Sequence, residues 1–487
     1  MKTKNLIYLF CLTLVLGLTT SCGSSSGGGT LPPDPPTPNP PVETYTDAEL
    51  EKVACEYMLS ADFVETDEVS VLLWLQGSYP KIAADATLVT KVVTKVANRP
   101  AGTSGSRTVL VYQAAQNSLG KFSSSDVDEM LKGFADGAIN AQRHNLLVFI
   151  DDADGNPEIY QIMKDSDGKV TKQKIYVFGQ DYNSASPATL KEVMKKVTRC
   201  YPAETYGFVY WSHGEAWVPY PVATKSLTPM ADVEYRWIGQ DTGFNNTRTQ
   251  IVELAEVFKS LNIYLDFLMF DACYMLSAEV AYDLKDVTDY IVSSPTEIPG
   301  PGAPYDIIIP KMFGSNAAVN IPKSYVDYYR ATYDETRVNL NTWWTGGASV
   351  GVIKAPEMER LAQATKEAVE TVDDDYFLPA LKTGQMDYDL RSSSSSYIGY
   401  FDMVSVMERL LSEESFNTWR IAYDAAVPVF DTTPMNFTAF NQSLFSMEKA
   451  HGMSMYIPRR KNSTIGIDVA FRETGWYQAA GLEALEW

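Results

Sequence analysis

Short, mostly apolar segments alternate with longer segments of helical periodicity from residue 107 onward. Five apolar runs are found at residues 108–113, 145–150, 206–211, 265–270 and 290–294. Runs of this length with apolar side chains at successive positions predict strands that are buried on both faces. Helical patterns separate them, at 125–140 (with Ser125 or Asp126 as the cap), 186–200, 247–261 and 277–287. This alternation predicts an α/β fold with a mainly parallel sheet flanked by helices on both faces.

Three further regions of the chain also have patterns that predict secondary structure. Residues 159–177, interrupted by Asp165-Ser-Asp-Gly168, have the pattern of a hairpin. In the less regular region before residue 106, the pattern predicts a helix over 47–59. The last third of the chain predicts a strand at 350–353, a helix at 356–372 and a strand at 453–457, which together form a C-terminal α/β extension.

The N-terminus has the features of an export signal. Lys2 and Lys4 precede an apolar stretch that is too short to span a bilayer, and small residues follow it. Cys22 stands directly after these small residues and before a Gly/Ser tract, an arrangement that resembles a bacterial lipobox. We therefore expect lipidation at Cys22 and a location in the bacterial cell envelope, at the outer membrane or facing the periplasm. The alternative is an ordinary cleaved signal.

These patterns divide the chain into five segments. A Pro-rich tract at 31–42 is expected to be an extended spacer. The length allows two or three domains. The predicted divisions are a signal peptide (1–21), a lipidated linker (22–44), a mostly helical N-terminal segment (45–105), an α/β core (106–310) and the C-terminal extension (311–487).

The net charge bears on the binding partners of the chain, and the number of cysteines bears on its disulfides. The formal net charge is −21, which disfavours binding to nucleic acid because an acidic surface repels phosphates. Removal of the signal and lipidation would leave Cys55, Cys200 and Cys273, an odd number, so at least one thiol is unpaired. Cys55 and Cys200 lie in helical patterns and are expected in the core.

Reactive residues follow two of the predicted strands. The third strand runs into Trp211-Ser-His-Gly and the fourth into Phe270-Asp-Ala-Cys. Because parallel strands end at the same edge of a sheet, His213 and Cys273 are predicted to lie together. An imidazole that accepts the thiol proton activates the sulfur as a nucleophile. A helix beginning near Ser277 would add its positive end to the site.

The two blocks, with further segments in the same order, resemble the clostripain family of cysteine peptidases. The matching segments are 109–112, 116–119, 294–300 and 451–458, so the resemblance covers about residues 107–460. It implies a caspase-like fold and endopeptidase activity after Arg or Lys. It also implies that His213 is the base, that Cys273 is the nucleophile, and that the Gly214 and Cys273 amides stabilise the oxyanion. Asp271 matches the acid that lines the pocket for the basic substrate side chain.

The chain departs from the family pattern in two places. Ala216 replaces a frequent glycine, and the loop after the fifth strand reads Pro-Gly-Ala at 301–303 where relatives carry an acid. The missing acid weakens the expected preference for Arg. Family members also process themselves between the two motifs, for which Lys225, Arg236 and Arg248 are candidates; the alternative is a simple long loop.

Other motifs have simpler interpretations. His144 and His451 precede their strands, so structural roles are expected. Gly347-Ala-Ser-Val-Gly351 matches a nucleophile elbow but lies inside a strand pattern. The Asp-rich segments at 151–156 and 165–168 lack the spaced acid of an EF-hand and are interpreted as solvated turns. We expect a monomer without a cofactor, apart from possible weak calcium binding. The alternative function is a non-catalytic envelope protein that uses the fold as a binding scaffold.

Overall fold

The computed structural model describes most of the chain after residue 43. The described ranges are 44–60, 62–63, 67–97, 105–136, 139–141, 143–165, 167–218, 237–334, 346–373, 376–391 and 397–487. Residues 47–487 form one compact unit. Cys22, Lys225 and Arg236 lie outside the described residues.

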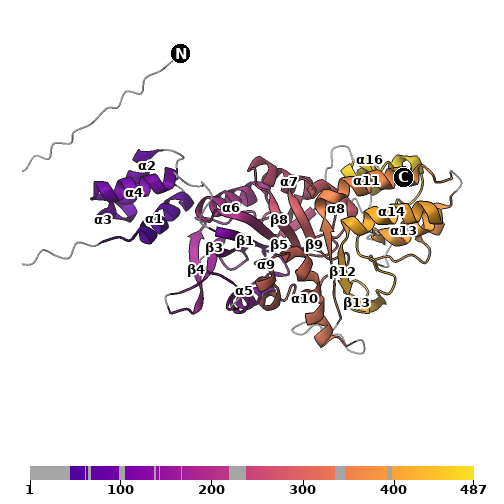
Figure 1. The fold of residues 1–487 in the computed structure, drawn as a ribbon, viewed down its shortest axis with the longest axis horizontal. Helices are drawn as coiled ribbons and strands as arrows, with labels where there is room; N and C mark the ends of the chain where they lie inside the picture. Colours follow the sequence, from indigo (N-terminus) through magenta and orange to yellow (C-terminus); the bar gives the residue numbers. More distant parts are fainter. Residues whose placement is uncertain are drawn as a thin grey trace, which may run out of the picture. The chain divides into compact units, whose positions relative to one another are not determined.

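A nine-stranded sheet forms the centre of this unit (Figure 1), in the order β12-β10-β9-β8-β5-β1-β2-β3-β4. Its strands are β1 (Gly105–Ala114), β2 (His144–Asp151), β3 (Glu158–Lys164), β4 (Val170–Val177), β5 (Ala203–Trp211), β8 (Leu265–Asp271), β9 (Thr288–Ser293), β10 (Ser349–Lys354) and β12 (Val429–Thr432). The five central strands, from β9 to β2, are parallel. The strands at both edges are antiparallel, including the predicted hairpin β3–β4. The predicted α/β class with a mainly parallel sheet is confirmed.

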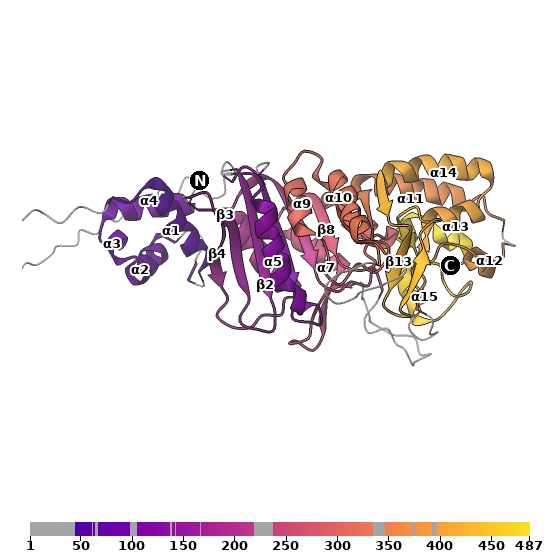
Figure 2. The same cartoon turned by 90° about the horizontal axis from the view of Figure 1, so that it is seen from below.

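Helices cover both faces of the sheet because its strands are apolar on both sides. Leu110 and Tyr112 pack into the core beneath α6 (Pro187–Cys200), α7 (Ile251–Ser260) and α8 (Ala278–Leu284). Val109 and Val111 point to the other core, beneath α5 (Gly120–Phe134), α9 (Tyr305–Met312) and α10 (Ala317–Thr332). Figure 2 shows α5, α9 and α10 on the near face. This arrangement follows from the alternation of successive side chains along a strand.

Four helices precede the sheet, of which the sequence pattern predicted the first. They are α1 (Asp47–Leu59), α2 (Glu68–Ser78), α3 (Pro80–Ala83) and α4 (Ala86–Ala97). The side chain of Asp67 caps α2 by accepting the Val69 N–H. Helix α1 packs against α4 and against α6 of the sheet layer, so the N-terminal segment is in contact with the helices that cover the sheet.

The last third of the chain extends the sheet and adds a helical layer. Strands β10 and β12 continue the main sheet beyond β9. The other elements of this third are η1 (Ala355–Glu357), α11 (Met358–Val369), α12 (Leu378–Lys382), β11 (Phe401–Asp402), α13 (Met403–Leu410), α14 (Glu413–Ala426), β13 (Met435–Thr438), β14 (Ser443–Ser446), β15 (Ser454–Met455), α15 (Gly466–Arg472), α16 (Gly475–Ala479) and η2 (Leu482–Leu485). Earlier in the chain, β6 (Trp237–Asp241) and β7 (Thr247–Gln250) form a separate hairpin. In the described part of the chain, every helix is too short or too polar to cross a bilayer.

Three predicted boundaries are wrong. Helix α5 starts at Gly120, so Ser125 and Asp126 lie inside it and neither is the cap. Residues 247–250 form β7, which pairs with β6, and α7 starts only after Gln250, where a capping box with Glu253 closes its first turn. The last predicted strand is reduced to the two residues of β15, which pair with β11. In the second and third cases, pairing with another strand competes with the local pattern.

Candidate active site

The two motif residues emerge from neighbouring parallel strands. Strands β5 and β8 are paired up to Trp211 opposite Asp271, and His213 and Cys273 each follow two residues later. The chains remain in contact beyond the strands, since a Cβ added to Gly214 would lie 3.0 Å from the Cys273 carbonyl oxygen. A side chain at position 214 would therefore force the two segments apart. The structure thus brings the histidine and cysteine segments together at one edge of the sheet.

A third polar group contacts the imidazole. Ser118 Oγ lies 2.9 Å from His213 Nε2. Ser118 belongs to the turn after β1, which Asn117 holds by donating hydrogen bonds to the carbonyls of Ala114 (2.8 Å) and Gln240 (2.9 Å). In the tautomer in which Nε2–H donates to Ser118 Oγ, Nδ1 is the ring nitrogen that can accept a proton. Sequence reasoning had used this turn only as part of the family resemblance and had missed Ser118.

The protonation states of the pair are those of two neutral groups. Burial, and then the charge of Arg248, lower the pKa of His213 below its usual value. Burial raises the pKa of the partly buried Cys273 thiol far above its usual value, and the carboxylates of Glu297 and Glu215 raise it further. No hydrogen bond joins His213 to Cys273 within the described residues. The resting site therefore holds a thiol and an imidazole, not a thiolate–imidazolium pair.

The positive end of helix α8 contributes little to stabilising a thiolate at Cys273. The cap of α8 is Ser277, as predicted, and its side chain accepts the Val280 N–H. The helix is short, however, and its first turn lies several residues beyond Cys273. Its positive end does not outweigh the burial that raises the pKa of the thiol.

The backbone beside the thiol has two amides without acceptors. Neither Gly214 N–H nor Cys273 N–H donates a hydrogen bond within the described residues. The neighbouring backbone is held firmly: the His213 carbonyl accepts the Gly239 N–H at 2.9 Å, and Tyr274 donates to the Thr296 carbonyl at 3.0 Å. Tyr274 adopts a positive φ of 63°, which bends the chain directly after the cysteine. Unpaired amides in a fixed backbone are suited to bind an oxyanion.

A buried carboxylate lies beneath these groups. Asp271 Oδ2 accepts hydrogen bonds from Ala303 N–H (3.1 Å) and from the Tyr305 hydroxyl (2.9 Å), whereas its Oδ1 has no partner among the described residues. Burial raises the pKa of Asp271 to about 6, so this group is mostly ionised at pH 7. Its neighbour Asp126 accepts a hydrogen bond from Trp211 Nε1, and burial raises its pKa to about 9. Asp126 is therefore neutral at pH 7, and Asp271 carries the charge of this pair.

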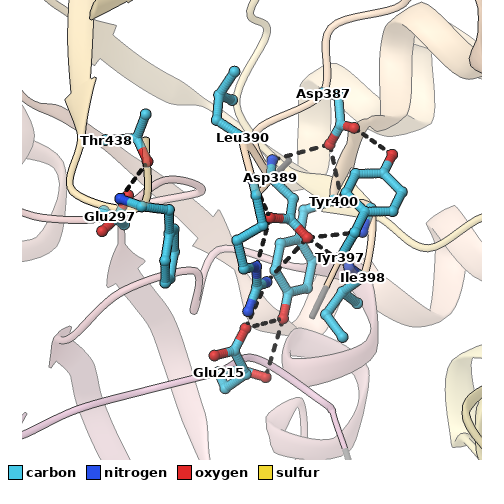
Figure 3. A network of polar contacts seen from close by, with 12 residues as sticks. Glu215, Glu297, Asp387, Asp389, Leu390, Tyr397, Ile398, Tyr400 and Thr438 are labelled. Atoms are coloured by element: carbon cyan, nitrogen blue, oxygen red, sulfur yellow. Dashed lines mark hydrogen bonds and ion pairs between the residues drawn. The ribbon is translucent and has the colours of Figure 1, made fainter. Parts of the chain in front are cut away.

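A polar network from the C-terminal third supports the segment after His213 (Figure 3). The Arg391 guanidinium lies 2.8 Å from Glu215 Oε1 and 2.6 Å from Asp389 Oδ1. The Tyr400 hydroxyl donates to the same Glu215 oxygen at 2.8 Å. The side chain of Arg391 is only 8% exposed, so the ion pair is shielded from water. The sequence offered no signal for this network, because Arg391 precedes a Ser-rich stretch that has the pattern of a flexible loop.

The other histidines, the serine motif and Arg248 lie in other structural settings than His213 and Cys273. His144 begins β2 at the opposite edge of the sheet and stacks on Phe313. His451 pairs with Asp402 at 3.0 Å, and Ser349 is buried inside β10, as the strand pattern predicted. The guanidinium of Arg248 covers the Trp237 ring at 4.3 Å and its backbone is part of β7. A residue in a paired strand is a poor cleavage site, which argues against processing after Arg248.

The Asp-rich segments form turns. The carboxylate of Asp152 accepts the Asp154 N–H, and Asp165 accepts the N–H groups of Asp167 and Lys169 across the hairpin. Within the ranges that the structure describes, no three His, Cys, Asp or Glu side chains converge to form a metal site.

The sequence and the fold of the chain are similar to those of known proteins. Residues 111–480 match the model of the clostripain family. A secreted C11 cysteine protease from Bacteroides thetaiotaomicron, solved with an irreversible peptide inhibitor, is 36% identical, with a TM-score of 0.67 over 77% of this chain and 99% of that one. An inactive zymogen C11 protease from Parabacteroides distasonis is 27% identical, with a TM-score of 0.63 over 78% and 99% of the two chains. Curated protein sequences contain no significant match.

Proposed function

Since the chain belongs to the clostripain family and is a cysteine peptidase, we propose that it is an endopeptidase with Cys273 as nucleophile and His213 as general base. The observation that carries this proposal is the position of the two residues, each two residues beyond the paired ends of β5 and β8. Covalent catalysis requires a thiol and a base within reach of one substrate carbonyl. The pairing of β5 with β8 as adjacent parallel strands supports this arrangement.

The proposed reaction begins from the neutral pair. As the Cys273 sulfur attacks the substrate carbonyl carbon, its proton passes to His213, and Ser118 holds the imidazole through Nε2. The Gly214 and Cys273 amides donate hydrogen bonds to the carbonyl oxygen as it becomes negative. His213 then protonates the leaving amine, and water hydrolyses the thioester to restore the thiol. The dyad requires no cofactor for these steps.

We further propose that the substrate residue before the cleaved bond is Arg or Lys. The free Oδ1 of Asp271 would accept a hydrogen bond from the cationic side chain. Relatives carry an acid in this loop, where the present chain has Pro-Gly-Ala at 301–303. Gly302 packs against the Asp271 carboxylate, and the Ala303 N–H donates to Oδ2 of that carboxylate. Asp271 therefore offers a carboxylate that is mostly ionised at pH 7. One charge favours a cation over a neutral side chain but discriminates less than two.

The proposed setting is the bacterial envelope. Cys22 would carry the lipid, and the Pro-rich spacer would hold a monomeric peptidase away from the outer membrane or periplasmic surface, where it would meet peptide or protein substrates. The secreted relative supports export. Substitution Cys22→Ala should release the protein from the membrane fraction.

Self-processing would cut after Lys225 or Arg236, and weak calcium binding would appear as a loss of activity in EDTA that calcium restores.

The central test compares reporters with Arg, Lys or a neutral residue before the cleaved bond. We expect turnover of the basic reporters by the wild type, none by Cys273→Ala or His213→Ala, and labelling of Cys273 by a thiol-directed inhibitor. Cys55→Ala is the matched control, because it removes a partly buried thiol outside the site. Absence of both turnover and labelling would instead favour the binding-protein alternative. Fragment mapping of wild type beside Cys273→Ala tests self-processing.

A further inference from the structure

Two cysteines outside the candidate active site lie in contact. Cys55 lies on α1 and Cys200 is the last residue of α6, 145 positions further along the chain. The Cys200 thiol donates a hydrogen bond to the Cys55 carbonyl at 3.4 Å. The two thiols also interact with each other, and this interaction, after burial, raises the pKa of Cys55. The structure shows no disulfide at either cysteine.

The surroundings fix the two helices against each other at this point. Met58 and Leu59 pack with Cys200 in a small apolar core. The Lys196 ammonium, on α6, donates a hydrogen bond to the Leu59 carbonyl at 2.6 Å. The end of α1 is therefore held on α6 by apolar and polar contacts, so that a sulfur–sulfur bond would join elements that are already adjacent.

A cavity gives access to this pair. It has a volume of about 320 Å³, and Cys55, Cys200, Tyr201 and Lys174 are among the residues that line it. Cys55 is partly exposed, whereas Cys200 is only 5% exposed. A small disulfide could therefore approach Cys55 first and leave Cys200 to complete the exchange from inside.

We propose that Cys55 and Cys200 form a disulfide that ties the N-terminal helices α1–α4 to the helical layer of the sheet. In the first step the Cys55 thiolate attacks the disulfide of an oxidant, either a low-molecular-weight disulfide or a thiol-disulfide oxidoreductase, and expels one oxidant thiol. Cys200 then attacks the mixed disulfide and expels the second thiol. The two cysteines lose two electrons and two protons, and the oxidant disulfide is reduced to two thiols. This bond goes beyond the peptidase reaction and depends only on the proposed export to an oxidising compartment.

The bond would have two consequences. It would leave Cys273 as the only free thiol of the three described cysteines, which prevents the nucleophile from pairing with either of the others. It would also close a loop of 145 residues, and cross-links across long loops restrict the unfolded chain the most. The oxidised protein would therefore unfold at a higher temperature than the reduced one.

Peptide mapping of the full chain, exported into an oxidising compartment, tests the proposal. The protein carries Cys273→Ala, so that the outcome does not depend on peptidase activity, and is alkylated while denatured without reductant. Trypsin cuts after Lys52 and Arg199, close to each cysteine. We expect one linked pair of peptides that contains Cys55 and Cys200 and separates on reduction. Alkylation of both cysteines, even after incubation with oxidised glutathione, would overturn the proposal, as would a different pairing.

Thermal unfolding provides the second measurement. Reductant should lower the Tm of the oxidised protein and leave the Tm of Cys55→Ser and Cys200→Ser unchanged. An equal effect of reductant on all three proteins would overturn the stabilising role. Because the alkylation experiment needs no cysteine variant at positions 55 or 200, a folding defect in these variants would not affect it.

Discussion

Arg391 Nη2 lies 2.8 Å from Glu215 Oε1, although 176 positions separate the two residues along the chain. Glu215 comes two residues after His213, and its backbone N–H is held by the Trp237 carbonyl. The ion pair, together with the Tyr400 hydroxyl, thus anchors the segment that carries the proposed base and Gly214. The C-terminal third of the chain therefore supports the candidate site directly.

Substitution Arg391→Gln should impair both stability and catalysis. It leaves the shielded carboxylates of Glu215 and Asp389 without their cation, at a cost of about 3 kcal/mol. A shift of the His213 segment should lower kcat/KM roughly 10–100-fold. Denaturant unfolding and reporter kinetics measure the two effects. Arg330→Gln is the matched control, because Arg330 pairs with Asp431 at the exposed surface. Equal kinetics for the two variants would contradict the anchoring role.

Ser118→Ala should reduce kcat about tenfold with little change in KM, because the imidazole loses the group that orients it while the substrate pocket is untouched. The acid limb of the pH profile should also move, since the hydrogen bond to Nε2 affects His213 protonation. Ser125→Ala serves as the control, because the Ser125 hydroxyl donates to the Phe122 carbonyl of its own helix. A Ser118→Ala enzyme with unchanged kcat and pH profile would rule out this role.

Asp271→Asn should change specificity more than catalysis. Asn keeps an oxygen for the Ala303 N–H and the Tyr305 hydroxyl but has no charge for Arg or Lys. Loss of a charged partner costs about 2–5 kcal/mol, so kcat/KM for an Arg reporter should fall roughly 100-fold while a neutral reporter changes little. Asp289→Asn, on the surface beside Tyr264, is the control. A parallel loss for both reporters would show that Asp271 is structural instead.

The pH profile of kcat/KM should depend on the reporter. Asp271, with a pKa of about 6, must be ionised to bind a basic side chain, and protonation below that pH removes the charge. His213 must be neutral to act as a base, and its pKa is lower than usual. We expect an acid limb near pH 6 for the Arg reporter that changes in Asp271→Asn, whereas the limb of a neutral reporter depends on His213 and stays the same in that variant. An Arg profile that Asp271→Asn leaves unchanged would argue against Asp271 as the group that binds the substrate cation.

Asp126→Asn should stabilise the protein at neutral and alkaline pH. The folded pKa of about 9 lies above the ordinary value of 3.8, so the folded state holds a proton that the unfolded state releases. This group therefore costs stability as the pH rises from 4 toward 9, by about 1.4 kcal/mol per unit. Asn binds no such proton and can still accept from Trp211. Denaturant unfolding at pH 5 and pH 8 should show a gain for Asp126→Asn that is larger at pH 8.

Asp128→Asn, which alters an exposed acid on the same helix, provides the comparison for this measurement. The gain is attributed to burial only if Asp128→Asn leaves the free energy of unfolding unchanged at both pH values. A loss of stability for Asp126→Asn at pH 8 would contradict the assigned protonation state.

Much of the sheet could be predicted because its strands are encoded locally. The run 265–270 is apolar at nearly every position, and such a run suits only a strand that is buried on both faces. The helix at 47–59 was predicted to the residue. The segment 247–250 was mistaken for helix because its pairing with β6 adds hydrogen bonds that no local pattern reveals. Helix α5 likewise begins earlier than its polar residues suggest.

The sequence by itself predicted that His213 and Cys273 each follow an apolar strand, because strand periodicity is a short-range property. The pairing of β5 with β8, which makes the two strands neighbours, belongs to the tertiary structure. Only the tertiary structure decided which groups surround the two residues. Ser118, Arg391 and the contact of Cys55 with Cys200 each depend on segments that meet across the fold. Local patterns report which face of an element is buried, but the partner of a polar side chain is set by packing between elements, and that information is spread over the whole chain.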